Sequence, residues 1–303
     1  MKRSGPRLSE RRREVLYGYA YVLPALIFMI ALIGFPIAYN IYISFFDMTA
    51  QSIGKGHSPF IGIQNYIAIF HNPTMWTALE NTFFYTVFCI LFQFVIGFSF
   101  ALFFSRKFKA ARYIKGLLVI GYMMPMTVVA LMFKFMLSPS NGVINDILAN
   151  LHIIKEPIEW LLSEKTVLWG LIITNTWVGI PFNMLLLSTG LDNVPAEVYE
   201  SASIDGVNAA QKLFLITVPM IKQSILSVLI LGFVYTFKVF DLVYVTTGGG
   251  PVDASEVLST FSYNLSFKTY YFGQGAAAAN VLFACLFAVA LLYLKLIGKD
   301  EVN

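Results

Sequence analysis

The chain has 303 residues, of which 57% are hydrophobic and only 13% carry a charge. A soluble domain carries roughly 25% charged residues. With 28 Phe and 16 Tyr as well, the chain has more apolar surface than a soluble enzyme can bury, so we expect a protein that uses lipid as its solvent. The basic residues behind the net charge of +4 gather in particular loops, which suits membrane orientation better than nucleic-acid binding.

Six stretches of the sequence are long and apolar enough to cross a bilayer, which requires about 20 residues each. They are 19–40, 82–104, 116–137, 167–189, 224–246 and 276–297. The expected fold class is therefore an all-α membrane protein with six transmembrane helices. Glu80-Asn81-Thr82 predicts the start of the second helix. Prolines are expected to interrupt several spans, as in helices that line cavities; they are Pro24, Pro36, Pro125 and Pro181.

Lysine and arginine concentrate on one side of these spans. The N-terminal tail holds six, the 105–115 loop five, the 190–223 loop two and the C-terminal end two, whereas the alternate loops hold only Lys55, Lys155, Lys165 and Lys268. Because cytoplasmic loops carry excess positive charge, both termini are expected in the cytoplasm. The chain then divides into a basic cytoplasmic tail (1–18), a six-span transmembrane domain (19–297) and a short cytoplasmic tail (298–303).

The cytoplasmic loop 191–220 is more than a simple connector, because its sequence predicts two short helices around a turn. The signals, in order, are a cap at Asp192 or Asn193, Pro195 in the first turn, a turn at Gly206, a cap at Asn208 and a stop at Pro219. Val198, Ala202 and Ile204 are expected near one face of the first helix. Such a pair either packs on its own spans or docks on a cytoplasmic partner.

The loop also carries Glu200-Ser201-Ala202, Asp205-Gly206 and Ile216-x-x-Pro219, which resembles the EAA signature of permease subunits of binding-protein-dependent ABC importers. Ser201 and Val207 depart from it, since alanine is usual at both positions. Further matching motifs are similar to the carbohydrate-uptake branch; they are Leu23-Pro24, Phe35-Pro36, Ser44-Phe45, the segment 60–66, Asn81-Thr82, Trp177-x-Gly179-x-Pro181, Phe240-Asp241 and 247–251.

The resemblance implies a type I importer permease that moves a sugar or oligosaccharide across a prokaryotic plasma membrane. Its partners would be a second permease subunit, two cytoplasmic ATPase subunits and an extracytoplasmic solute-binding protein. The residues Glu200, Ser201, Ala202, Asp205 and Gly206 would form the helix that couples the chain to an ATPase, with Gly206 making the turn. The structural alternative for Glu200 is a solvated carboxylate at a helix start.

The resemblance also implies which residues face the substrate passage. They are Asn175, Val178, Gly179 and Phe182 on the fourth span, with Gly232, Tyr235, Thr236 and Val239 on the fifth. Aromatic faces and hydrogen-bonding groups at mid-depth are what a sugar cavity requires. We expect Phe182 and Tyr235 to face each other across a narrow gap. An ordinary helix–helix contact remains the alternative for each residue.

Two lysines lie within the expected spans, where an unpaired charge is costly. Lys134 is close to a span end, so its side chain is expected to extend to the interface. Lys238 lies deeper, and Asp241 follows three residues later, so an intramembrane ion pair along one helical face is expected. A direct contact of this pair with substrate is the alternative.

No sequence signature of an enzyme is present. A phosphate-binding motif Gly-x-x-x-x-Gly-Lys-Ser/Thr does not occur, and Gly248-Gly249-Gly250-Pro251 reads as a turn. ATP and Mg²⁺ are therefore expected on the partner ATPase, and no cofactor on this chain. Cys89 and Cys285 lie in apolar runs, and the three histidines have no metal-ligand spacing.

Other functions stay open on the residues alone. They are an ion-coupled secondary transporter, an importer permease for a solute other than a sugar, and a membrane anchor or sensor. The secondary transporter would need intramembrane carboxylates, and Asp241 is the one carboxylate clearly within an expected span.

The charge distribution makes the topology testable. Cysteines introduced as Ser58→Cys and Asp253→Cys should react with an impermeant thiol reagent in intact cells, because both positions lie in loops poor in lysine and arginine. Lys109→Cys should react only after the cells are permeabilised. Labelling in the reverse pattern would overturn the orientation.

Overall fold

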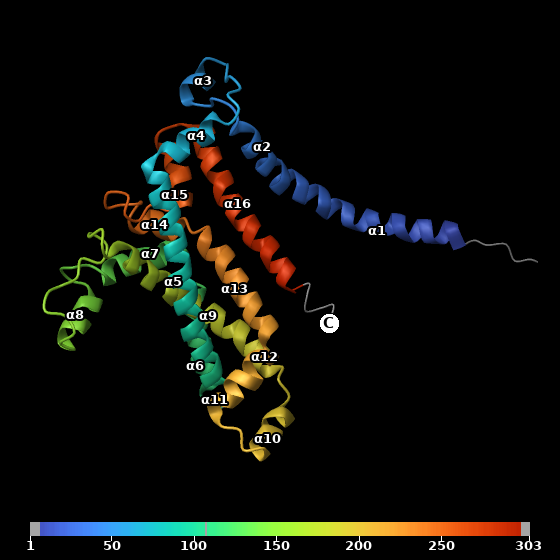
Figure 1. The fold of residues 1–303 in the computed structure, drawn as a ribbon, viewed down its shortest axis with the longest axis vertical. Coiled ribbons are helices and arrows are strands. Elements are labelled where there is room, and N and C mark those ends of the chain that lie inside the picture. Colours follow the sequence, from blue (N-terminus) through green and yellow to red (C-terminus); the bar gives the residue numbers. More distant parts are fainter. Residues whose placement is uncertain (1–6, 107, 298–303) are drawn as a thin grey trace, which may run out of the picture.

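The computed structural model describes residues 7–106 and 108–297, which are almost entirely helical (Figure 1). The expected N-terminal tail lies partly outside these residues, and the expected tail 298–303 lies wholly outside them. Helices α3 (Ala50–Gly54) and α4 (Gln64–His71) lie at one end of the molecule, and α10 (Ala196–Ile204) lies at the other. Helix α1 (Arg7–Met29) extends away from the body of the molecule.

Four helices of the described residues are long and apolar enough to cross a membrane. The first joins α1 to α2 (Phe35–Ile43) through a π-helical turn, Ile30–Gly34, and the others are α5 (Pro73–Phe104), α9 (Val167–Asp192) and α16 (Phe272–Ile297). They confirm helices at the first, second, fourth and sixth expected spans. Counting each of two bent helix pairs as one span gives up to six by length and composition.

The third expected span is not one straight helix. Helices α6 (Ala111–Tyr122) and α7 (Met126–Met136) meet at 95°. Pro125 stands at the bend, where it supplies no backbone N–H and disfavours a helical conformation in the residue before it. Lys134 is exposed in the last turn of α7, the position expected of a side chain that reaches the interface.

The fifth expected span, 224–246, is wrong over its last part. Helix α13 (Lys222–Phe237) ends before Lys238, and a separate helix α14 (Asp241–Thr246) follows. At its other end α13 meets a helical segment, Ala209–Met220, at 72°. That segment comprises α11 (Ala209–Gln211), a π-helical part (Lys212–Thr217) and α12 (Val218–Met220). The bend follows Pro219, as expected of a helix stop.

Two further expectations about helix ends are wrong. Pro24 and Pro181 lie inside continuous helices, α1 and α9, and do not interrupt them. Helix α5 begins at Pro73, well before the expected start at Thr82, because the side chain of Asn72 accepts a hydrogen bond from Thr74 N (2.9 Å) and caps it there. The shorter elements are α8 (Val143–Asn150), α15 (Leu258–Tyr263) and the π-helical Asn264–Lys268.

Helices α5 and α9 pack with their backbones close together. At Gly97 of α5, a Cβ atom would lie 2.6 Å from Asn183 Cβ and 3.2 Å from the carbonyl oxygen of Ile180. Small residues permit such close helix packing in membranes, where dispersion contacts rather than hydrophobicity hold helices together. Gly97 therefore fixes the separation of the two helices that carry the buried centre of the fold.

The close contact predicts a difference between two glycines. Gly97→Ala should destabilise the chain by about 1–3 kcal/mol, because the new methyl group meets backbone and a buried side chain. Gly116→Ala on α6 is the matched control, since nothing lies within 4 Å of its Cβ position. Thermal unfolding of the detergent-solubilised chain measures both, and equal melting temperatures for the two variants would contradict the packing argument.

Candidate functional site

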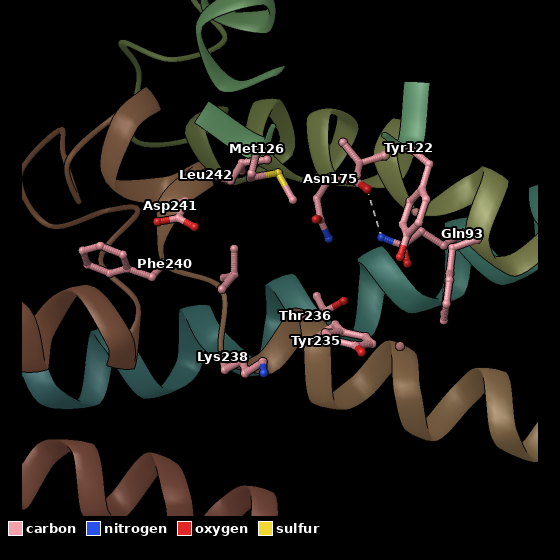
Figure 2. Close-up of a pocket in the computed structure, with 15 residues that line it drawn as sticks. Gln93, Tyr122, Met126, Asn175, Tyr235, Thr236, Lys238, Phe240, Asp241 and Leu242 are labelled. Atoms are coloured by element: carbon pink, nitrogen blue, oxygen red, sulfur yellow. Dashed lines mark hydrogen bonds between the residues drawn. The ribbon is translucent and has the colours of Figure 1, made fainter. Parts of the chain in front are cut away.

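A cavity of about 320 Å³ lies between α9 and α13 (Figure 2). It is next to the bend between α6 and α7 and to the break that follows α13. The eight residues expected to face the passage all line it; they are Asn175, Val178, Gly179, Phe182, Gly232, Tyr235, Thr236 and Val239. The structure therefore brings residues of two separate expected spans together around one cavity. The cavity volume falls in the range of small-molecule sites.

One wall of the cavity depends on Gly179. The side-chain amide of Gln93, on α5, donates a hydrogen bond to the carbonyl oxygen of Asn175 (3.0 Å). A Cβ atom on Gly179 would lie 2.2 Å from Gln93 Cδ, so only glycine lets Gln93 cross α9 at this point. Figure 2 shows Asn175 pointing from α9 toward Thr236, and its buried amide nitrogen has no hydrogen-bond partner.

The aromatic residues form a continuous wall rather than two opposed faces. The rings of Phe182 and Tyr235 are 6.2 Å apart at 88°, an edge-to-face contact, and Tyr122 stacks on Phe182 at 5.7 Å. The expected gap between Phe182 and Tyr235 is therefore wrong, because the two rings touch. Tyr235 remains 58% exposed and lines the cavity.

The expected Lys238–Asp241 pair along one helical face is also wrong. The helix ends at Phe237, so the two residues do not share a helical register, and they form no ion pair in the described structure. Lys238 Nζ lies instead 5.3 Å from the centre of the Tyr235 ring, a cation–π contact. Both charged residues line the cavity. The freed carbonyl of Val239 accepts a hydrogen bond from the Ser259 hydroxyl of α15.

Sequence reasoning missed five residues of the lining, namely Gln93, Tyr122, Met126, Phe240 and Leu242. Gln93 had a usable signal, because it is the one amide side chain in the apolar run 82–104. Tyr122 and Met126 flank the bend near Pro125, and Phe240 and Leu242 follow the break in the fifth expected span. The direction in which these four side chains point depends on the geometry of the two breaks, which the sequence does not specify.

The loop between α9 and α13 contains two helical segments, as expected, and only the cap of the first differs from the expectation. Helix α9 runs to Asp192, so neither Asp192 nor Asn193 caps α10, which begins after Pro195. Gly206 makes the turn with φ of +72°, and Asn208 caps α11 by accepting a hydrogen bond from Gln211 N (2.9 Å).

The side chains of the first loop helix do not share one apolar face. Ala202 is buried, whereas Ile204 is 86% exposed, so their expected common face is wrong. The other residues of the expected coupling set are exposed; they are Glu200, Ser201, Asp205 and Gly206.

The site offers binding groups rather than metal chemistry. In residues 7–106 and 108–297, no three His, Cys, Asp or Glu side chains gather as metal ligands would. Cys89 and Cys285 are free thiols. The cavity instead presents amides, hydroxyls, aromatic rings and two charged groups.

Comparison with known proteins identifies the family. Residues 93–299 match the family described as binding-protein-dependent transport system inner membrane component. A probable ABC transporter permease of Bacillus subtilis is 32% identical over 287 residues, covering 93% of this chain and 97% of that protein. A trehalose transport system permease of Mycobacterium tuberculosis is 30% identical and covers 98% of this chain and 92% of its own.

A solved structure shows the same fold. A chain of a bacterial ABC transporter that imports alginate aligns with a TM-score of 0.80 at 20% identity, covering 97% of this chain and 99% of that one. The permease fold expected from the sequence is thereby confirmed. The chain belongs to the inner-membrane components of binding-protein-dependent transport systems, and is a multi-pass membrane protein of a transporter family rather than an enzyme.

Proposed function

We propose that this chain is one of the two membrane subunits of an ATP-driven importer for a sugar or oligosaccharide, which an extracytoplasmic solute-binding protein delivers. The observation that carries the proposal is the cavity to which residues of both α9 and α13 contribute. Relatives support the substrate class, since one is named a trehalose/maltose permease, from Thermococcus litoralis, and another a trehalose permease.

The chemistry of the cavity fits a polyhydroxylated solute. Asn175 offers a buried amide nitrogen without a partner, and a sugar hydroxyl can accept its hydrogen bond. Tyr235 offers an aromatic face on which a sugar ring packs. Lys238 adds a hydrogen-bond donor and Asp241 an acceptor. Both are available to a solute, because the two residues form no ion pair with each other.

The proposed assembly contains a second permease, two ATPase subunits that hold ATP and Mg²⁺, and the solute-binding protein. In it the chain crosses the bilayer six times, with both termini and the 191–220 loop in the cytoplasm. A neighbouring solved structure supports the delivery step, because it shows the alginate transporter in complex with a periplasmic protein bound to an alginate pentasaccharide.

Within the loop, exposure divides the proposed coupling residues into two roles. Ala202 is 5% exposed, so it packs inside the loop and sets its shape. Glu200, Ser201, Asp205 and Gly206 are exposed and would contact the ATPase. ATP-driven closure of the ATPases would then move the loop and switch the cavity between outward and inward access.

Aromatic truncation tests the passage. Tyr235→Ala and Phe182→Ala should each weaken solute uptake, because one lost ring contact is worth about 1 kcal/mol, or about five-fold in affinity. ATP hydrolysis stimulated by the binding protein should persist in the reconstituted transporter. Phe287→Ala is the control, since this exposed aromatic on α16 is not among the cavity residues. Normal uptake in both cavity variants would show that the solute passes elsewhere.

A backbone substitution tests the coupling loop. Gly206→Pro should abolish solute-stimulated ATPase activity, because proline cannot adopt the positive φ of this turn. Gly56→Pro, in the loop near α3, is matched: Gly56 has φ of +69°, and each glycine N–H donates to the carbonyl three residues before it. The control should retain stimulation at a normal expression level. Stimulation in both variants would rule out this loop as the coupling element.

A further inference from the structure

The α14–α15 loop contains a carboxyl group that neither the cavity nor the coupling loop uses. The loop folds as a turn, with φ of +63° at Gly248 and +96° at Gly249. The hydroxyls of Thr247 and Ser255 are 2.8 Å apart, and Ser255 Oγ donates to the carbonyl of Gly250 (2.5 Å). The turn expected from the glycine run is confirmed.

The carboxyl group belongs to Glu256, which is only 2% exposed. Asn264 Nδ2 donates a hydrogen bond to Glu256 Oε1 (2.8 Å). A Cβ atom on Gly249 would lie 1.8 Å from Glu256 Oε2, so the carboxyl lies directly against the glycine turn. Asn264 Oδ1 is buried and receives no hydrogen bond. An ionised Glu256 carboxylate could not donate one, because it can only accept hydrogen bonds, whereas a protonated carboxyl carries an O–H donor. The surroundings of Glu256 therefore suit a protonated group better than an anion.

The same residue joins the loop to α5. Asn81 Nδ2 donates to the backbone carbonyls of Glu256 (2.9 Å) and Ala254 (3.1 Å). Thr82 Oγ1 accepts a hydrogen bond from Leu258 N (2.9 Å). Asn81 and Thr82, expected to start a helix, instead hold the α14–α15 loop.

From Glu256 the contacts lead on to the cavity. Helix α15 follows it directly, and the Ser259 hydroxyl of this helix donates to Val239 at the break in the fifth span. Tyr263, also on α15, lies 5.0 Å from Phe240, ring centre to ring centre. Val239 and Phe240 both line the cavity. A change in how the α14–α15 loop packs therefore affects the chain break after Phe237, and this break shapes the cavity.

The pKa of Glu256 is raised from 4.5 to about 7, and burial is the largest cause. Within that net value, Asp253 on the same loop also raises the pKa, while hydrogen bonds from Thr260 and Asn264 and the charge of Lys268 lower it. The groups that α5 presents, Asn81 and Thr82, are uncharged. Because the pKa is raised in the packed loop, packing is most favoured below pH 4.5, weakens as the pH rises toward 7, and is constant above that.

We propose that Glu256 is a positioning residue: its protonated form keeps the α14–α15 loop packed on α5 and α15, and so holds the broken fifth span in its cavity-lining shape. Ionisation of Glu256 loosens the loop. The part concerning the loop stands on the contacts of this chain alone, and the part concerning solute rests on the proposed function of the cavity.

Hydrogen exchange of the loop amides in the purified full-length chain tests the first part. After correction for intrinsic exchange, the opening of residues 247–256 should increase by up to about 10-fold per pH unit between pH 5 and 7 and then level off. Glu256→Gln keeps the hydrogen-bond acceptor for Asn264 but cannot ionise, so its loop should open equally at every pH. The same pH dependence in Glu256→Gln, or none in the natural chain, would overturn the proposal.

Two charge variants locate the titrating group. Asp253→Asn removes a charge that raises the pKa of Glu256, so opening should level off at a lower pH. Lys268→Gln removes a charge that lowers the pKa, so opening should level off at a higher pH. Curves that coincide with the natural chain would show that another group titrates.

Solute uptake by the assembled transporter tests the second part. The KM for uptake should change with pH along the same curve as loop opening, and this change should be absent in Glu256→Gln. A pH-independent KM in the natural transporter, with the loop curve intact, would overturn the link to the cavity. Absence of any uptake would contradict the proposed function and leave the loop result standing.

Discussion

Backbone groups inside a membrane must find their hydrogen-bond partners within the protein, and the cavity depends on how this chain meets that requirement where the fifth expected span breaks. Helix α13 stops at Phe237, and the carbonyl of Val239 accepts a hydrogen bond from Ser259 of α15. With that carbonyl satisfied, the chain can leave the helix axis. Phe240 and Leu242 then turn into the cavity instead of continuing along α13.

The helices that cross the bilayer were predictable because lipid imposes a length on every apolar run. The bend at Pro125 was expected as well, but the break after Phe237 was not. Residues 238–240 contain neither proline nor glycine, and their break is stabilised by Ser259, which is remote in the sequence. Pro181 gives the opposite case, because α9 continues through it. Local sequence thus predicted the helices, whereas a hydrogen bond from a remote residue stabilises the end of α13.

The residues of the candidate site also include some that could be predicted from the sequence and some that could not. Hydropathy does not tell which face of an apolar helix meets a cavity, so the eight lining residues could be predicted only through the family pattern. Gln93 joins them because Gly97 and Gly179 let α5 and α9 approach closely, which is a property of helix pairs and not of one segment. The Lys238–Asp241 pair failed because it assumed an unbroken helical period.

The two cavity walls and the 191–220 loop form one mechanical path. Helix α9 ends at Asp192 where the loop begins, and α13 begins at Lys222 where it ends. Tyr199 and Thr217 hydroxyls lie 3.1 Å apart, and Lys212 Nζ donates to Ser203 Oγ (2.5 Å), so the two arms of the loop are tied together. A loop on flexible linkers would absorb a push from an ATPase. Here short connections join both arms to the helices that hold Asn175 and Tyr235, so a displacement of the loop would be passed to the two walls.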